Sequence, residues 1–258
     1  MGLPRISPIK TNEMNKRSRV AWVNLLGLGA LVGLCLLGWL AIVWTAQNMA
    51  HPSVQLMMPP SAGWSSAQAF MVFAMWAVMM GAMMLPSAAP MIVAHQRMSG
   101  QIGRHAAFVA AYLMAWAGFS LMATTAQWGF QSAGQLSRMV VLQNDIWAGL
   151  LLVAIGVFQF TPLKTLCLST CRTPIGFLMH DWRDGVGGAF VMGLRHGVYC
   201  IGCCWALMAA LFVFGVMNIY AIAVLSTIVL VEKITPPRLF VAQIIGLGCI
   251  VLGLWRLI

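Results

Sequence analysis

Residues 20–46 read VAWVNLLGLGALVGLCLLGWLAIVWTA, a run of 27 residues without a charged side chain. A helix needs about 20 apolar residues to cross the hydrocarbon core of a bilayer, so this run is long enough for one full span. It follows the basic residues KRSR (16–19), as the apolar part of a secretory signal would. That part is only about 7 to 15 residues long in a signal peptide, so we interpret 20–46 as a retained membrane anchor.

The rest of the chain has the same apolar character. Hydrophobic residues make up 61% of the 258 residues and charged residues only 8%, which excludes a soluble globular domain. We therefore predict an all-α fold, a polytopic transmembrane helical bundle that forms a single domain over 20–258 after a cytoplasmic basic tail at 1–19. Seven spans are expected, at about 20–46, 67–94, 106–127, 146–163, 186–214, 217–233 and 239–256.

The basic residues predict the orientation of these spans. With the N-terminus in the cytoplasm, twelve Lys and Arg residues fall on inner segments and only Arg138 and Arg256 fall on outer ones. Cytoplasmic loops of membrane proteins carry such an excess, so the C-terminus is expected outside and the protein in a bacterial inner (plasma) membrane. The partner implied by the net charge of +10 is thus the lipid bilayer, and no nucleic acid is expected.

Methionines cluster in the second span. Met71, Met75, Met79 and Met83 recur every four residues and fall on one helical stripe. Thioether sulfur is a soft, neutral ligand that suits Cu(I), so Met75, Met79 and Met83 are candidate metal ligands. Packing is the alternative interpretation, because methionine also fills irregular gaps in protein cores. The following segment PSAAP (86–90) has two prolines that are expected to kink or end the helix.

The predicted outer loop before this span also holds soft donors. Met49, His51, Met57 and Met58 lie there with no charged residue between them. Such a loop could collect a soft cation and pass it to the methionine stripe, although an ordinary proline-rich turn would have the same composition.

The fifth span contains residues 193–205, GLRHGVYCIGCCW, where polar and reactive side chains interrupt an apolar helix. At about 100° per residue, His196, Cys200, Cys203 and Cys204 face one way, toward the bundle. Thiolates with an imidazole bind Cu(I) or zinc, and copper(I) is our first choice. One helix seldom surrounds a metal alone, so we expect the methionine stripe to complete the site.

A short link to the sixth span sets the depth of the charged residues. The link is so short that the fifth and sixth spans must form an antiparallel hairpin. Counting the same rise per residue along both helices from the turn puts Cys200 at the level of Glu232 and Lys233. It puts Arg195 near the inner boundary of the membrane. Ionisable residues inside a membrane are costly and mark functional sites, so Arg195, Glu232 and Lys233 are candidates to surround the ligands. The candidate partners of Glu232 are Arg195, Lys233 and His196. A purely structural ion network at the inner interface is the alternative.

The other cysteines are less informative. Cys167 and Cys171 lie four residues apart in a predicted inner loop and would share one helix face, either as a cytoplasmic delivery site or as incidental thiols. His95 and His105 flank another inner loop and are expected at the membrane interface. Two lone cysteines in apolar spans are expected to be small core residues: Cys35 and Cys249.

The sequence resembles a bacterial family of predicted metal-binding integral membrane proteins, a domain of unknown function. The resemblance covers roughly residues 68–234 and rests on AMMLPSAAPM (82–91), GLRHGVYCIGCCWALM (193–208), GVMN (215–218) and the final VEK (231–233). It implies metal binding, with no assigned reaction. The motif positions that match are Arg195, Gly197, Cys200, Gly202, Cys203, Cys204, Trp205, Met217, Asn218, Glu232 and Lys233.

Three functions fit these residues. The first is copper(I) handling through an intramembrane Cys/Met site, by transport or by delivery to a membrane copper enzyme or a copper chaperone; the sequence has no ATP-binding motif of a pump. The second is a membrane thiol-disulfide oxidoreductase using Cys200 and Cys203, although the second thiol pair that such enzymes need on the outer side is missing. The third is a non-catalytic assembly subunit of a membrane complex. A protein without catalytic activity is favoured over an enzyme.

Overall fold

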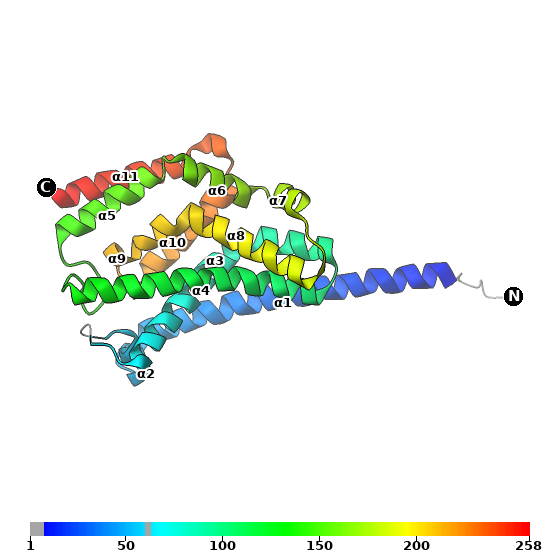
Figure 1. Cartoon of the computed structure of the whole chain (residues 1–258), viewed down its shortest axis with the longest axis horizontal. Helices are drawn as coiled ribbons and strands as arrows, with labels where there is room; N and C mark the ends of the chain where they lie inside the picture. The colour runs from blue at the N-terminus through cyan, green and yellow to red at the C-terminus, as the bar shows by residue number, and fades with distance from the viewer. Residues whose placement is uncertain (1–7, 60–62) are drawn as a thin grey trace.

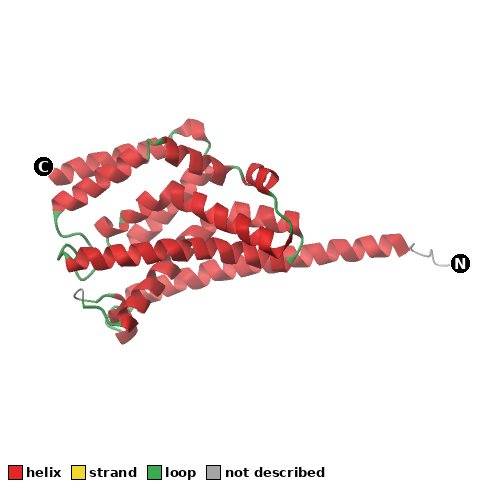
Figure 2. Cartoon of the chain, viewed as in Figure 1, coloured by secondary structure: helices red, strands yellow, loops and turns green. Residues whose placement is uncertain are grey.

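The computed structural model describes residues 8–59 and 63–258, without the side chains of most residues before Leu25. Throughout these ranges the regular structure is helical, apart from one isolated β-bridge between Leu136 and Leu142 (Figures 1 and 2), which confirms the all-α prediction there. In chain order the helices are α1 (Pro8–Gln47), α2 (Pro52–Met57), α3 (Ser66–Ser99), α4 (Ile102–Ser132), α5 (Asp145–Phe158), α6 (Pro162–Arg172), α7 (Pro174–Asp181), α8 (Gly185–Ala209), α9 (Leu211–Phe214), α10 (Ile219–Ile234), η1 (Pro237–Leu239, a 3-10 turn) and α11 (Val241–Leu257).

Helix α1 extends beyond the predicted first span. It begins at Pro8 rather than at residue 20, and its N-terminal part projects past the other helices in Figure 1. Residues 1–7 of the predicted basic tail lie outside the described residues. The division of the chain into a tail at 1–19 and one membrane domain therefore stays a prediction.

Five helical segments are long and apolar enough to cross a membrane. They are Leu25–Gln47, Ser66–Ser99, Ile102–Ser132, Gly185–Phe214 and Pro237–Leu257. Helices α5 and α6 together would make a sixth span, bent by 62° at the break between them. Helix α10, which corresponds to another predicted span, has only 16 residues and falls short of the roughly 20 needed for a straight crossing. The count of seven and the orientation stay predictions.

The peripheral helices expose apolar side chains. Leu36, Leu37 and Leu40 on α1 are 59%, 66% and 64% exposed, and Leu247 and Val251 on α11 are 59% and 57% exposed. Large continuous apolar surfaces of this kind mark a region that contacts lipid or another protein. The surface of α1 and α11 thus suits a hydrocarbon environment.

Helix α8 packs directly against α4, and glycines allow the close approach. A Cβ atom at Gly193 would overlap the carbonyl oxygen of Phe108, and one at Gly197 would lie 2.5 Å from the Cβ of Ala115. Small residues let helix backbones touch in this way in membrane proteins. The contact fixes the rotation of α8 and turns its cysteines toward α3 and α6.

Helix α3 continues through Pro86 and Pro90, so of the two outcomes expected for these prolines, a kink or an end of the helix, the end is excluded. Each proline lacks an N–H group and disturbs the hydrogen bonds of the preceding turn. Side chains of two neighbouring helices donate to carbonyl oxygens just before Pro86: Tyr112 to that of Met84 and Ser226 to that of Met83, both at 3.2 Å. Such donors allow proline inside a buried helix.

Candidate metal centre

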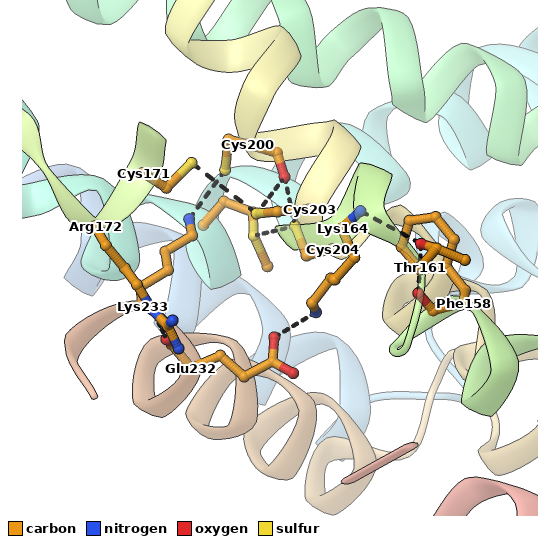
Figure 3. A network of polar contacts seen from close by, with 11 residues as sticks. Phe158, Thr161, Lys164, Cys171, Arg172, Cys200, Cys203, Cys204, Glu232 and Lys233 are labelled. Carbon is orange, nitrogen blue, oxygen red and sulfur yellow. Dashed lines mark hydrogen bonds and ion pairs between the residues drawn. The ribbon is translucent and has the colours of Figure 1, made fainter. Parts of the chain in front are cut away.

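Four cysteine side chains from two helices meet inside the bundle (Figure 3). Cys200, Cys203 and Cys204 lie on α8 and are at most 1% exposed, and Cys171 lies on α6 and is 8% exposed. The sulfur atoms of Cys203 and Cys171 are 4.0 Å apart, and the thiols of Cys203 and Cys204 both donate to the backbone carbonyl oxygen of Cys200. We call these four residues the thiol cluster.

Helix α6 meets α8 at Gly202. A Cβ atom at this glycine would lie 2.7 Å from the sulfur of Cys167, so a larger residue there would force the Cys167 side chain to move. Cys167 and Cys171 are both buried, as expected for residues that share one helix face. The predicted inner loop is therefore a helix, started by Pro162 and by a hydrogen bond from the Lys164 amide to the Thr161 hydroxyl.

A thioether of α3 adjoins the thiol cluster. The sulfur of Met84 lies 3.8 Å from that of Cys204. The sequence favoured the neighbouring stripe of Met75, Met79 and Met83, and these three side chains are also buried, at 9%, 2% and 0% exposed. Met75 and Met79 lie closer to the start of α3, where they line a cavity. The contact with the thiols is made instead by Met84, which lies outside this stripe.

Lys233 supplies a buried positive charge at the cluster. Its Nζ donates hydrogen bonds to the sulfur of Cys200 at 3.0 Å and to the hydroxyl of Ser87 at 2.8 Å, while its side chain is only 6% exposed. The hydroxyl of Tyr112 also lies 3.2 Å from the sulfur of Cys200. The predicted level of Cys200 and Lys233 is confirmed by this contact. An ammonium group in a low-dielectric interior requires such a partner, and it favours negative charge on sulfur.

Glu232 points to a different partner, Lys164 on α6. Its Oε2 lies 2.6 Å from the Lys164 Nζ, and both side chains are 1% exposed. Arg172 donates to the backbone carbonyl of the same glutamate at 2.8 Å. None of the predicted partners, Arg195, Lys233 and His196, forms this pair, because consecutive residues of a helix point about 100° apart and Glu232 faces α6 while Lys233 faces α8 (Figure 3).

Two further residues from the sequence analysis lie apart from the thiols. Arg195 forms an ion pair with Asp181 of α7 at 2.6 Å and is 41% exposed. Asn218 caps α10, where its side-chain oxygen accepts from the amides of Tyr220 and Ala221 at 3.1 and 3.3 Å. Both contacts are structural ones between neighbouring parts of the chain.

His196 is buried among aromatic rings. It stacks on Tyr112 and Phe108, with ring centroids 5.6 and 6.2 Å apart, and it is 1% exposed. Neither ring nitrogen has a hydrogen-bond partner among the described residues. His95 and His105, which were expected at the interface, are also buried, at 0% and 6% exposed.

The remaining predicted sites have ordinary surroundings. Cys35 and Cys249 are partly buried and pack against the core, as expected for lone cysteines. In the predicted outer loop, the Nδ1 of His51 lies 2.8 Å from the hydroxyl of Ser53 at the start of α2, and Met58 is buried. That loop thus folds onto the bundle rather than standing free.

The donors at the thiol cluster suit a soft cation by their chemistry. Thiolates and thioethers select Cu(I) over hard cations. Within the described residues, no three His, Cys, Asp or Glu side chains stand where they could hold one ion together. The thiols of Cys203 and Cys204 are instead turned toward the carbonyl oxygen of Cys200, to which they donate at 3.1 and 2.9 Å. Binding a metal therefore requires these thiols to leave the carbonyl.

Sequence reasoning did not place four residues at the centre: Lys164, Cys171, Met84 and Tyr112. Cys171 was considered only as half of a separate pair with Cys167. A signal existed for two of them, because Lys164 and Cys171 are seven residues apart and share a helix face with Cys167. No local pattern distinguishes Met84 from the other methionines of α3 or Tyr112 from an ordinary core tyrosine.

A protein-family model described as PpoB2, copper chaperone, matches residues 73–256, well over half of the chain. The matched range includes all four cysteines of the thiol cluster, Met84 and Lys233. Neither a curated protein nor a solved structure matches the chain.

Proposed function

The chain belongs to the PpoB2 copper chaperone family, and we propose that it is an integral membrane protein that holds copper(I) at the thiol cluster and delivers it to a partner. Copper(I) is its cargo rather than a resident cofactor. Cys200 and Cys203 are the principal ligands, Cys204 and Cys171 are the alternatives for a third, and Met84 is a neutral donor beside them. This assignment adds Cys171 to the ligands expected from the sequence and takes Met84 in place of the stripe Met75, Met79 and Met83. It leaves out His196, whose ring stacks on Tyr112 and Phe108.

The observation that carries this proposal is the convergence of sulfur. Five sulfur atoms from α3, α6 and α8 lie together, each in a side chain at most 8% exposed. Soft ligands in a dry interior bind Cu(I) well and exclude water from it. Such a site holds the ion without releasing it to solvent, which is what a carrier of a reactive metal must do.

Lys233 supports the same function through charge. Two thiolates that share one Cu(I) ion carry a net charge of −1, which is costly in an apolar interior. The ammonium group 3.0 Å from Cys200 offsets this charge. The ion can thus be held without a net charge inside the bundle.

The decisive experiment is elemental analysis of the purified protein in detergent under reducing conditions. Wild type loaded with Cu(I) and then exposed to a chelator that removes weakly held copper should retain about one equivalent, and the triple variant C200S/C203S/C204S treated in the same way should retain none. Equal and negligible copper in both would overturn the proposal. Zinc in place of copper would keep the site and change its cargo, since Cys and His ligands also suit zinc.

One observation favours a second candidate function. The 4.0 Å separation of the Cys171 and Cys203 sulfurs would allow disulfide exchange between α6 and α8, as in a membrane thiol-disulfide oxidoreductase. The two functions differ in the redox state required. A copper carrier needs its thiols reduced, whereas an oxidoreductase would cycle between dithiol and disulfide with a quinone or a protein thiol as its electron partner.

The proposed location is the bacterial inner membrane, with the N-terminus inside and the C-terminus outside. The apolar surfaces of α1 and α11 and the distribution of basic residues support it. Fusing alkaline phosphatase to Ile258 should give active enzyme, and fusing green fluorescent protein there should give no fluorescence. The reverse pattern would contradict seven spans.

A further inference from the structure

A cavity lined by methionines lies beside α3, closer to the start of the helix than Met84, which touches the thiol cluster. It measures about 120 Å³ and is bounded by α1, α2, α3 and the turn that precedes α10. Four thioether side chains line it: Met57, Met75, Met79 and Met217. They come from three separate segments, so the gathering of sulfur here is a feature of the tertiary fold rather than of one helix.

The other lining residues limit what this cavity can bind. They are apolar except for Thr45, whose hydroxyl donates to the carbonyl oxygen of Ala41 on its own helix. No charged residue lines the cavity. Hard cations and anions are excluded because nothing there replaces their hydration. Neutral sulfur donors in an apolar pocket suit a soft monovalent cation.

We propose that the methionine-lined cavity is a second Cu(I) site, at which the ion is loaded before it reaches the thiol cluster. This inference rests on the proposed function, which it extends by naming a point of entry. Met75 and Met79 are the central ligands, and Met57 and Met217 complete the set from the sides.

Buried sulfur connects the two sites. Met79 and Met84 are five residues apart, so at 1.5 Å per residue they are separated by about 7.5 Å along α3. Met80, Met83 and Met84 in this interval are all 0% exposed, and Met84 touches Cys204. A Cu(I) ion can therefore move along α3 among thioethers without meeting water. Neutral thioethers leave its charge uncompensated, whereas the thiols near Lys233 can ionise, so the ion binds more weakly in the cavity than at the cluster.

The test uses the full chain with the thiol cluster removed, C171S/C200S/C203S/C204S. In detergent with ascorbate, competition with a chromophoric Cu(I) chelator should show about one residual equivalent, bound at least roughly tenfold more weakly than in wild type. Adding M75L and M79L should remove this equivalent. Leucine keeps the size and apolar character of methionine, so the change deletes sulfur alone.

Two controls make the result specific. M91L changes a methionine of α3 that is equally buried but does not line the cavity, and it should leave the residual copper unchanged. In selenomethionine-labelled protein, X-ray absorption at the copper edge should show a copper–selenium shell that M75L/M79L abolishes. Residual copper that is unaffected by M75L/M79L, or no residual copper at all, would overturn the inference and leave the cavity as a place for a lipid chain.

Failure of this inference can be told from failure of the proposed function. In a chain with its cysteines intact, M75L/M79L should slow the loading of the thiol cluster by at least roughly tenfold and leave the final copper content unchanged. Normal loading with normal content would reject the loading site and keep the thiol site. Copper that the cysteine-free variant retains with the affinity of wild type would reject the proposed function, whereas loss of that copper on adding M75L/M79L would still support the cavity.

Discussion

The Nζ of Lys233 on α10 lies 3.0 Å from the sulfur of Cys200 on α8, in the interior of the bundle. This contact joins a thiol of the cluster to the charge that a copper–dithiolate centre would need. Lys233 donates a second hydrogen bond to Ser87 on α3. The centre thus depends on three helices for one electrostatic relationship.

Replacing this lysine should weaken copper binding. K233M removes the charge and shortens the side chain by one atom, so the copper–dithiolate unit would keep a buried net charge. We expect the affinity for Cu(I) to fall at least tenfold, or by about 1.4 kcal/mol, in competition with a chelator. S87A removes one hydrogen bond of Lys233 and should have a smaller effect, of about 1 kcal/mol or less. Wild-type affinity in K233M would show that the charge of Lys233 is not needed.

The Lys164–Glu232 pair should behave as a structural element. Removing either partner alone, in K164M or E232Q, leaves the other polar group buried without its partner and should lower stability by about 3 to 5 kcal/mol. The double variant K164M/E232L should recover most of that loss, because an apolar pair can replace a buried ion pair. Thermal unfolding in detergent measures both effects. Recovered stability with lost copper binding in the double variant would instead assign Glu232 to the metal site.

Cys171 and Cys203 should form a disulfide when the copper-free protein is treated with diamide, because their sulfurs are 4.0 Å apart. Mass spectrometry of the digested protein should identify a peptide of α6 linked to one of α8. Loading with Cu(I) beforehand should protect both thiols. A disulfide that forms equally fast with and without copper would separate Cys171 from the metal site.

The contact between α8 and α4 should be intolerant of a methyl group. G193A places a Cβ atom against the backbone of Phe108 and should destabilise the protein by about 1 to 3 kcal/mol, the usual range for overpacking. G187A lies on the same helix with no atom near the added Cβ, so it should be neutral or slightly stabilising. Equal melting temperatures for the two variants would show that this contact is looser than described.

The sequence was sufficient for the fold class and for part of the centre. Apolar length predicted the helices, and the 100° rotation per residue placed Cys200, Cys203 and Cys204 on one face, where they are buried together. The hairpin register brought Lys233 to Cys200 because it depends only on rise per residue.

The remaining contacts depend on how helices rotate against one another, which no single helix encodes. Met84 rather than Met83 meets Cys204, a difference of one residue that turns the side chain by about 100°. The partner of Glu232 comes from α6, 68 residues earlier in the chain. Such a long-range pair depends on how α6 packs against the bundle, where it meets α8 at Gly202. No pattern within a single helix predicts it.

The most direct test of the central claim is X-ray absorption at the copper edge of the protein loaded with one equivalent of Cu(I). The account predicts a first shell made of sulfur alone, with a lower sulfur count in C200S/C203S than in wild type. A shell of nitrogen and oxygen, or one that the cysteine changes leave unaltered, would contradict the thiol cluster as the place where copper is held.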